Sequence, residues 1–122
     1  MTEIKITIPY IPALSKNRRF IGKFNKVKSP DHAKAQDLIE MLFRRELINK
    51  PVIEKQKVWV SIMWYRKDMR GDLQNWVNPI CDSIKRCLSF DDNYFAFDNL
   101  DWIVCKENPR MEISFKYQEN LL

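Results

Sequence analysis

The sequence predicts a single small α/β (α+β) domain, with one mixed sheet of about four strands and two main helices. Three observations predict it. Four short segments are apolar in strand-like patterns, and two longer segments repeat apolar residues at helical spacing. The chain has 122 residues, of which 45% are hydrophobic, enough for one core but not for two ordinary domains. We therefore treat residues 1–122 as one domain.

Four segments have the pattern of strands. In EIKITIP, the side chains from Ile4 to Ile8 alternate apolar and polar, as in a half-buried strand that ends at Pro9. KVWVSIMWYR is apolar on both faces, so we expect it to be the central strand, covered on both sides. LDWIVCK predicts a third strand, and RMEISFKY predicts a fourth with one solvent-facing side. The buried face of that last strand consists of Met111, Ile113, Phe115 and Tyr117.

Two segments have the pattern of helices. Ser29 can cap free amides and Pro30 suits a first turn, so together they indicate a helix start, and we expect this helix to run to about residue 49. Its buried stripe comprises Ala35, Leu38, Ile39, Leu42 and Phe43. We expect a second helix from about Asn75, which would leave Pro79 in the first turn, where a missing amide is tolerated. Its buried stripe comprises Leu73, Trp76, Val77, Ile80, Ile84 and Leu88.

Composition indicates the compartment and excludes several classes of protein. No apolar run is long enough to cross a bilayer, so we expect no membrane partner. The three cysteines are odd in number and lack CxxC spacing, and there is a single histidine, which argues against a disulfide framework or a zinc site. Cys81 and Cys87 are interpreted as core residues. A cytoplasmic location is expected.

A basic segment at about residues 14–28 is the candidate DNA-binding loop. It contains no Asp or Glu, and its cations alternate with Phe20, Phe24 and the flexible Gly22. The candidate DNA contacts in it are Lys16, Asn17, Arg18, Arg19, Lys23, Lys26 and Lys28. The alternative is a solvated basic loop whose two phenylalanines pack on the core.

Three aspartates are the candidate metal ligands. Asp72 follows Gly71 just before the second helix, and FDDNYF supplies Asp91 and Asp92 after it. Each has an ordinary explanation, because Asp72 could cap the helix and the adjacent pair could form a turn. If the helix instead returns the pair to the edge where Asp72 lies, converging carboxylates can bind Mg²⁺, which activates water and stabilises charge on a phosphodiester.

The order GDLQN, CDSIK and FDDNYF resembles the RusA family of Holliday junction resolvases, whose pattern is a D-x-D-N-L-x-K helix start, an internal Asp-Ala-Leu and a later Asp-Asp pair. ITIPYIP near the start and RMEISF near the end fall in the family's order, so the resemblance covers nearly the whole chain. It implies a RusA-like fold and a homodimer that nicks opposed strands of four-way junctions in branched DNA. The implied cofactor is Mg²⁺, with Mn²⁺ as a substitute.

The resemblance also implies roles for individual residues. Asp72 and Asp92 match catalytic aspartates that bind metal, with Asp91 as a neighbour. Gln74 stands where the family has a second metal-binding aspartate, and Asn78 stands where it has a lysine. The catalytic candidates are Asp72, Asp92, Asp91 and Gln74, of which the three aspartates are the metal candidates. Further DNA-binding candidates are Arg70, Asn75, Asn78 and Lys85.

The expected function is therefore a Mg²⁺-dependent, structure-selective DNA endonuclease that resolves four-way junctions by paired phosphodiester hydrolysis. Gln74 brings no charge, and the loss of one carboxylate weakens a divalent site. Asp68 could supply the absent charge, and Lys67, Lys85 or Arg86 could replace the missing cation. The alternative is a catalytically weakened or inactive module of the same fold that binds branched DNA or a protein partner.

Overall fold

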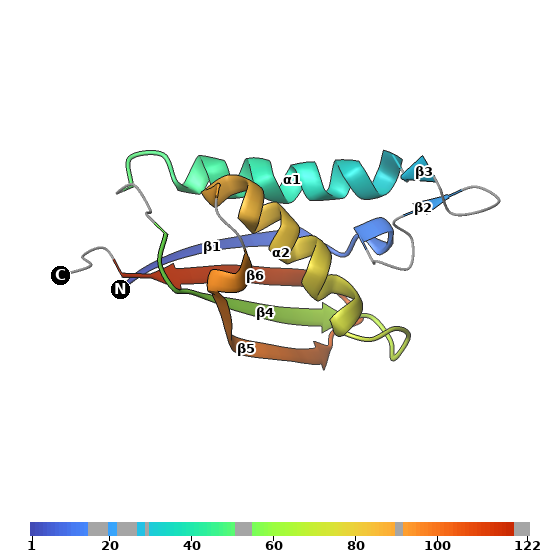
Figure 1. The fold of residues 1–122 in the computed structure, drawn as a ribbon. Coiled ribbons are helices and arrows are strands. Elements are labelled where there is room, and N and C mark those ends of the chain that lie inside the picture. Colours follow the sequence, from blue (N-terminus) through green and yellow to red (C-terminus); the bar gives the residue numbers. More distant parts are fainter. Residues whose placement is uncertain (15–19, 22–26, 29, 51–54, 90–91, 119–122) are drawn as a thin grey trace.

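The computed structural model describes residues 1–14, 20–21, 27–28, 30–50, 55–89 and 92–118. The main sheet has four strands in the spatial order β1 (Thr2–Pro9), β6 (Arg110–Tyr117), β4 (Val58–Arg66) and β5 (Phe95–Val104). The remaining elements are the short hairpin of β2 (Phe20–Ile21) and β3 (Val27–Lys28), the 3₁₀ turns η1 (Pro12–Leu14) and η3 (Asp92–Tyr94), and the helices α1 (Pro30–Glu46) and α2 (Gln74–Leu88). The predicted α+β class, with one mixed sheet and two main helices, is confirmed (Figure 1).

The sheet is mixed because its last two neighbours are joined by a helix rather than by a turn. β6 pairs antiparallel with β1 and with β4, whereas β4 pairs parallel with β5. A parallel pair requires a crossover connection, and α2 provides it. Figure 1 shows α2 running back across the sheet, from the carboxyl end of β4 toward the start of β5.

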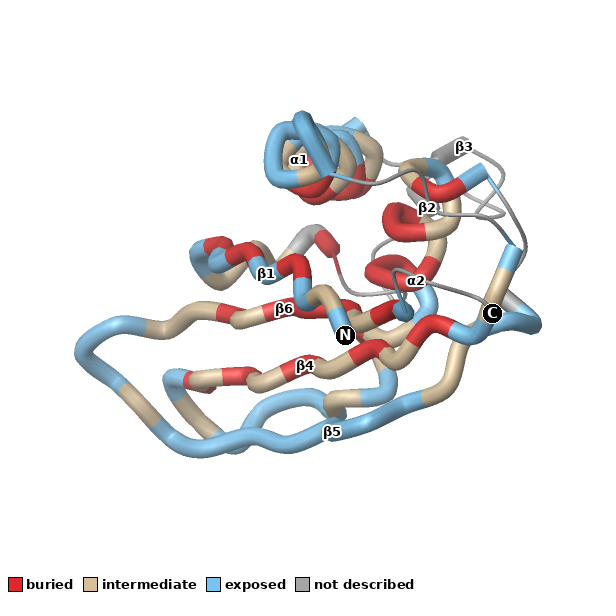
Figure 2. The backbone as a smooth tube through the Cα atoms, turned by 90° about the vertical axis from the view of Figure 1, so that its left-hand side faces the viewer, coloured by how far each residue is buried: buried red, intermediate tan, exposed pale blue. Residues whose placement is uncertain are grey.

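Both helices pack on the same face of the sheet, so the core is one-sided (Figure 2). Side chains from Ile4, Ile62 and Ile113 reach this face and are almost completely buried. The residues that alternate with them along β4 are only partly buried. The expectation that β4 is covered on both sides was therefore wrong, although its central place in the sheet is confirmed. Its second face is apolar without being enclosed.

The helices follow the predicted stripes with shifted ends. Ala35, Ile39 and Phe43 are buried on α1, which ends at Glu46, before the expected residue 49. On α2, the buried stripe of Trp76, Ile80, Ile84 and Leu88 is confirmed. The helix begins at Gln74, one residue before the expected start, and Pro79 lies inside it rather than in its first turn. None of the helices in the described segments is long and apolar enough to cross a membrane.

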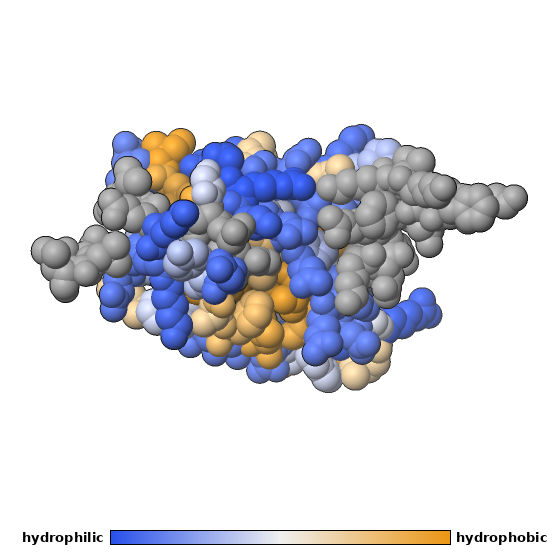
Figure 3. Space-filling view, in the orientation of Figure 1, coloured by the Kyte–Doolittle hydropathy of each residue, from blue (hydrophilic) through white to orange (hydrophobic). Residues whose placement is uncertain are grey.

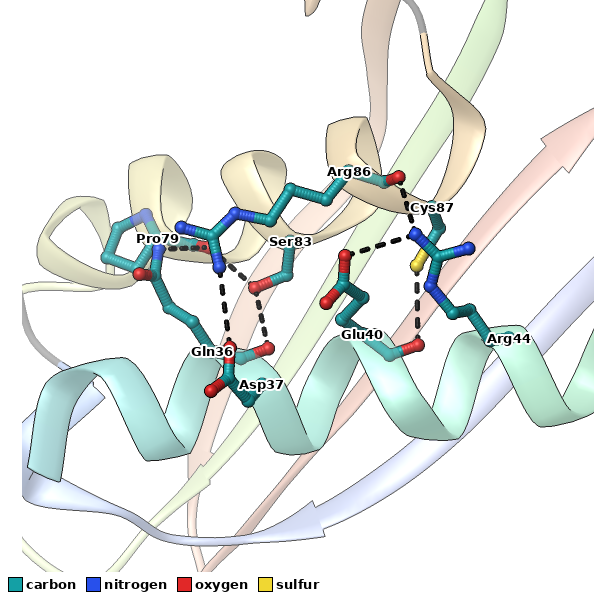
Figure 4. Close-up of polar contacts among 8 residues, drawn as sticks. All are labelled: Gln36, Asp37, Glu40, Arg44, Pro79, Ser83, Arg86 and Cys87. Atoms are coloured by element: carbon teal, nitrogen blue, oxygen red, sulfur yellow. Dashed lines mark hydrogen bonds and ion pairs between the residues drawn. The ribbon is translucent and has the colours of Figure 1, made fainter.

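A buried polar contact joins the two helices at Pro79 (Figure 4). The side-chain amide of Gln36 donates to the Pro79 carbonyl at 3.2 Å. The Ser83 hydroxyl donates to the Gln36 carbonyl at 3.1 Å, and it lies 3.2 Å from the Pro79 carbonyl. Gln36 and Ser83 are fully buried. This contact fixes the register of α1 against α2.

β5 is an edge strand that the helices leave uncovered. Its helix-facing residues pair with buried β4 residues, for example Leu100 with Ile62 and Trp102 with Trp64. Even so, its large apolar side chains are between 38% and 50% exposed: Phe97, Leu100, Trp102, Ile103 and Val104. Figure 3 shows apolar side chains gathered at this edge of the molecule. The opposite edge, β1, alternates buried isoleucines with exposed polar residues, as is usual for an edge strand that faces water.

We expect Gln36→Ala to lower the free energy of unfolding by about 2–4 kcal/mol, because it removes a buried hydrogen bond and leaves a cavity between the helices. Urea unfolding measures this loss. The matched control is Asp37→Ala at the next position, where an exposed carboxylate lies 3.6 Å from Arg86. That change should cost less than about 0.5 kcal/mol. Equal losses in the two variants would show that the buried contact does not hold the helices together.

Candidate metal and nucleic-acid site

Asp72 lies just before α2 with a fixed backbone and a free carboxylate. Its carbonyl accepts the Asn75 amide at 3.0 Å, which ties it to the first turn. The N-cap position itself is occupied by Leu73, which forms no side-chain capping bond. Within the described segments, the Asp72 carboxylate has neither a hydrogen bond nor an ion pair, and the residue is exposed. Helix capping, the ordinary explanation for this aspartate, is therefore not its role here.

The loop before Asp72 is closed by Asp68. The Asp68 carboxylate accepts the Arg70 amide at 3.0 Å, and the Arg70 guanidinium lies 3.9 Å from its second oxygen. Asp68 thus shapes the turn rather than standing free as a substitute ligand. The Arg70 side chain is 91% exposed, so it can still reach a phosphate.

Three more candidates lie along the first turns of α2. Gln74 and Asn78 are exposed, and their spacing of four residues places them on one face of the helix. Asn75 is half-buried beside them. Lys85 lies in the last turn of α2, seven residues beyond Asn78, and is therefore separated from the nearest member of this group by about 10 Å along the helix. Arg70, Asp72, Gln74 and Asn78 are the exposed candidates at this end of α2, and we call them the N-terminal cluster of α2 for their place in the chain.

Asp92 does not join the N-terminal cluster within one chain. It begins η3, after α2 has run its full 15 residues, which is a length of about 22 Å. Its neighbour Phe95 pairs with Val58 at the start of β4, whereas Asp72 follows the end of that strand. The expectation that α2 returns Asp92 to Asp72 was wrong for a single chain, because a parallel crossover connects opposite ends of a sheet. Asp91 lies outside the described residues.

Metal-ligand clusters are absent from the part of one chain that the structure describes. No three His, Cys, Asp or Glu residues come together there in a way that could hold a metal ion. The donors of the N-terminal cluster are one carboxylate and neutral amide oxygens, which are of the hard oxygen type that Mg²⁺ prefers. They fit part of a magnesium site and need at least one more carboxylate.

Most of the basic segment falls outside the described residues, namely Lys16, Asn17, Arg18, Arg19, Lys23 and Lys26. Only its short hairpin of β2 and β3 is described, and Lys28 belongs to β3. Figure 1 shows this hairpin and the N-terminus of α2 at the same end of the molecule. The DNA-binding role of these residues stays a prediction.

A hollow on the open face of the sheet is less suited to a nucleic acid than the N-terminal cluster of α2. Its volume is about 380 Å³, and its lining includes both signs of charge. Lys5 pairs with Glu112 at 3.2 Å, and Lys116 pairs with Asp98 at 2.9 Å. The Asp98 partner raises the pKa of Lys116. Because these cations are already paired, the hollow offers an incoming phosphate little net charge.

Cys81 is a core residue, as predicted, whereas Cys87 is half-buried and packs against the core. Cys81 is buried, and the Cys87 thiol donates to the Glu40 carbonyl at 3.3 Å (Figure 4). Burial raises the pKa of the Cys87 thiol to about 11, against a smaller lowering by Arg44. The thiol is therefore protonated at neutral pH and is a poor nucleophile.

Sequence reasoning missed Arg66, the buried residue that holds the loop before Asp72. The signal that could have found it is alternation: Arg66 continues the inward-facing series of Val58, Val60, Ile62 and Trp64 along β4. A charged side chain at such a position needs polar partners, and the following loop is the nearest source of them.

Comparison with known proteins gives no family: no family model matches the chain, and no curated protein is significantly similar to it. The resemblance to the RusA family therefore rests on motif order and remains a prediction.

We expect Cys87 to react with iodoacetamide at pH 8 about a hundredfold more slowly than a cysteine of the urea-unfolded chain, because its thiolate fraction is far smaller. Mass spectrometry of timed digests measures this rate. The difference should shrink as the pH rises toward the pKa of about 11. Modification at the unfolded rate would contradict the burial of this thiol.

Proposed function

We propose that the protein is a Mg²⁺-dependent endonuclease that cuts four-way DNA junctions as a homodimer. The observation that carries the proposal is the exposed Asp72 carboxylate at the N-terminus of a helix, which has no hydrogen bond or ion pair to any residue that the structure describes. A single chain supplies only this half of a site. The function therefore requires a second copy that delivers the other half.

The uncovered β5 edge supports such a pairing. It is ten residues long, it pairs only with β4 among the strands that the structure describes, and it carries two aspartates but no Lys, Arg or Pro. Four of its exposed apolar residues form a stripe on the helix-facing side, namely Phe97, Leu100, Trp102 and Val104, whereas Ile103 lies on the opposite face. Leu100 and Trp102 lie in the middle of this stripe. A two-fold axis perpendicular to the sheet would pair β5 with its copy antiparallel and join the two stripes on one face.

Antiparallel pairing of β5 would also change which ends of the sheet lie together. The start of β5, near Asp92, would lie beside the carboxyl end of the same strand in the second copy. In each chain, the carboxyl ends of β4 and β5 coincide, since Arg66 pairs with Val104. Asp92 of one copy would thus come to the end of the sheet from which Asp72 of the other copy projects. The α2 crossover separates Asp72 from Asp92 within one chain, and the dimer would bring Asp72 of each copy to Asp92 of the other.

Each residue then has a chemical role. Asp72 of one copy and Asp92 of the other would hold Mg²⁺, with Asp91 and the Gln74 amide oxygen as auxiliary ligands. When bound, the ion supplies positive charge against the negative charge that develops on a phosphodiester. Arg70 and the basic segment would hold backbone phosphates. Because a two-fold dimer has two equivalent sites, it can act on two opposed strands of a junction.

A second candidate function is a module that binds branched DNA without cutting it. The neutral Gln74, which is exposed beside Asp72, favours this candidate because it leaves the site one carboxylate short. Tight, salt-dependent junction binding without nicks at any Mg²⁺ or Mn²⁺ concentration would support it over the endonuclease.

We expect Leu100→Lys to convert the dimer to a monomer, because it places a charge in the middle of the apolar stripe. Sedimentation velocity at several protein concentrations measures the change. The control is Met41→Lys on α1, where the side chain is 49% exposed and distant from β5 along the fold. A dimer that survives Leu100→Lys would exclude β5 as the interface.

We expect Asp72→Asn and Asp92→Asn each to reduce junction cleavage by at least about a hundredfold, because each removes a charged ligand from both sites. Mixing the two variants should restore activity. A mixed dimer has one site with both substitutions and one site with neither, so it should nick one strand but not the opposed strand. Denaturing gels of a junction labelled on each strand measure this.

The mixing experiment separates the two arrangements. If each site were formed within one chain, every site in the mixed dimer would carry one substitution and no activity would return. Refolding the variants together from urea ensures that subunits exchange. Wild-type protein that leaves the junction intact would overturn the endonuclease proposal altogether.

A further inference from the structure

Arg66, at the end of β4, is a buried cation in a cage of backbone and aromatic groups. It is 3% exposed, and within the described segments it forms no ion pair. A buried charge without a counter-ion requires dense polar contacts. Arg66 finds them in the loop that leads to Asp72.

Three backbone carbonyls of this loop accept hydrogen bonds from one guanidinium. Arg66 Nε donates to the Asp68 carbonyl at 2.7 Å. Its Nη2 donates to the carbonyls of Arg70 at 3.2 Å and Gly71 at 2.8 Å. These bonds fold residues 67–71 around the end of the strand. Only a planar group with several donors can satisfy carbonyls in this arrangement, which is why a lysine would not be equivalent.

Two tryptophans provide the other contacts of this cage. The Arg66 guanidinium lies 4.2 Å from the centroid of the Trp64 ring and 4.7 Å from that of Trp102. Gly71 has a φ of +84°, a conformation that favours glycine, and an added Cβ there would meet the Trp64 ring at 3.9 Å. That contact is an ordinary van der Waals distance, so the constraint at Gly71 is its backbone conformation.

We propose that Arg66 is a positioning residue for Asp72; this inference rests on the proposed function. The carbonyl of Gly71, directly before Asp72, is bonded to Arg66, and the carbonyl of Asp72 is bonded to the first turn of α2. Asp72 is thus held on both sides while its carboxylate stays free. Fixing a ligand before the ion arrives reduces the ordering that binding requires, so Arg66 acts on metal affinity through Asp72.

The test is Arg66→Lys, which keeps the charge but loses the planar fork. Hydrogen exchange by NMR should show the Arg70 amide, which donates to the Asp68 carboxylate within this loop, exchanging at least about tenfold faster, without a matching change in β6. In junction cleavage, the Mg²⁺ concentration for half-maximal rate should rise at least about tenfold, whereas the rate at saturating Mg²⁺ should stay within about threefold of wild type. A merely structural role would lower the maximal rate through the folded fraction and leave the Mg²⁺ dependence unchanged.

The matched control is Arg110→Lys. Arg110 also stacks on a ring, 3.7 Å from the Tyr65 centroid, and donates to the Asn108 carbonyl at 3.1 Å, but it has no bond to residues 67–72. Its substitution should change neither the exchange of that loop nor the Mg²⁺ dependence. If Arg66→Lys does not unfold cooperatively in urea, Trp102→Leu replaces it, since this change removes one ring and keeps every bond to the carbonyls. Because Trp102 also lies in the proposed dimer interface, sedimentation velocity must show that this variant remains a dimer. We then expect the loop exchange rate and the Mg²⁺ concentration for half-maximal rate each to rise about threefold or more.

The outcomes are distinct. Unchanged loop exchange and unchanged Mg²⁺ dependence in the folded variant would overturn the positioning role and leave the endonuclease intact. Wild-type protein that does not cut junctions would overturn the proposed function, whereas loop exchange would still report whether Arg66 orders the backbone around Asp72.

Discussion

The parallel pairing of β4 with β5 is the constraint on which the rest of the molecule depends. Two neighbouring strands can run in the same direction only if the chain returns across the sheet between them, and α2 makes that return. Everything at the start of α2 is then placed at one end of the sheet, and everything after α2 at the other. Asp72 and Asp92 are separated for this reason, and no side-chain rotation can bring them together.

The same crossover explains why one edge of the sheet remains apolar. Two helices suffice to cover β1, β6 and β4, whose inward residues are fully buried, but β5 lies beyond them. Leaving such an edge exposed costs solubility and invites pairing with other chains. In the proposed dimer, a single symmetric contact between the two β5 strands would have two effects. It would cover the exposed apolar edge, and it would bring Asp72 of one copy to Asp92 of the other.

The periodicity of apolar residues predicted the fold well because it reflects directly which side chains are buried. The same one-sided core buries the alternating Ile4, Ile6 and Ile8 of β1 and the helical stripe of α2 that ends at Leu88. Both faces of β4 looked buried because Trp59, Met63 and Tyr65 are apolar, and composition does not reveal that both helices choose the same face. The start of α2 was predicted to within one residue, but Pro79 lies inside the helix rather than in its first turn, and its carbonyl accepts a hydrogen bond from Gln36 that the sequence does not reveal.

The candidate site was less predictable because it depends on topology and on backbone contacts. Motif order indicated Asp72 and Asp92 but not the direction of the helix between them. Arg66 went unnoticed because its partners are carbonyl groups, which every residue has and no motif records.

The role of Trp102 connects the loop to the sheet edge. Its ring stacks on Arg66, yet it is 41% exposed on β5, so one side of the cage that holds the Asp72 loop is open to solvent in a single chain. A second copy paired along β5 would exclude water from this ring, and cation–π contacts strengthen when they are desolvated. Dimer formation would then tighten the backbone around Asp72 as it supplies the second aspartate. The dimer would therefore form the site and order its Asp72 loop in the same step, whereas a monomer would have a less ordered loop and no second aspartate.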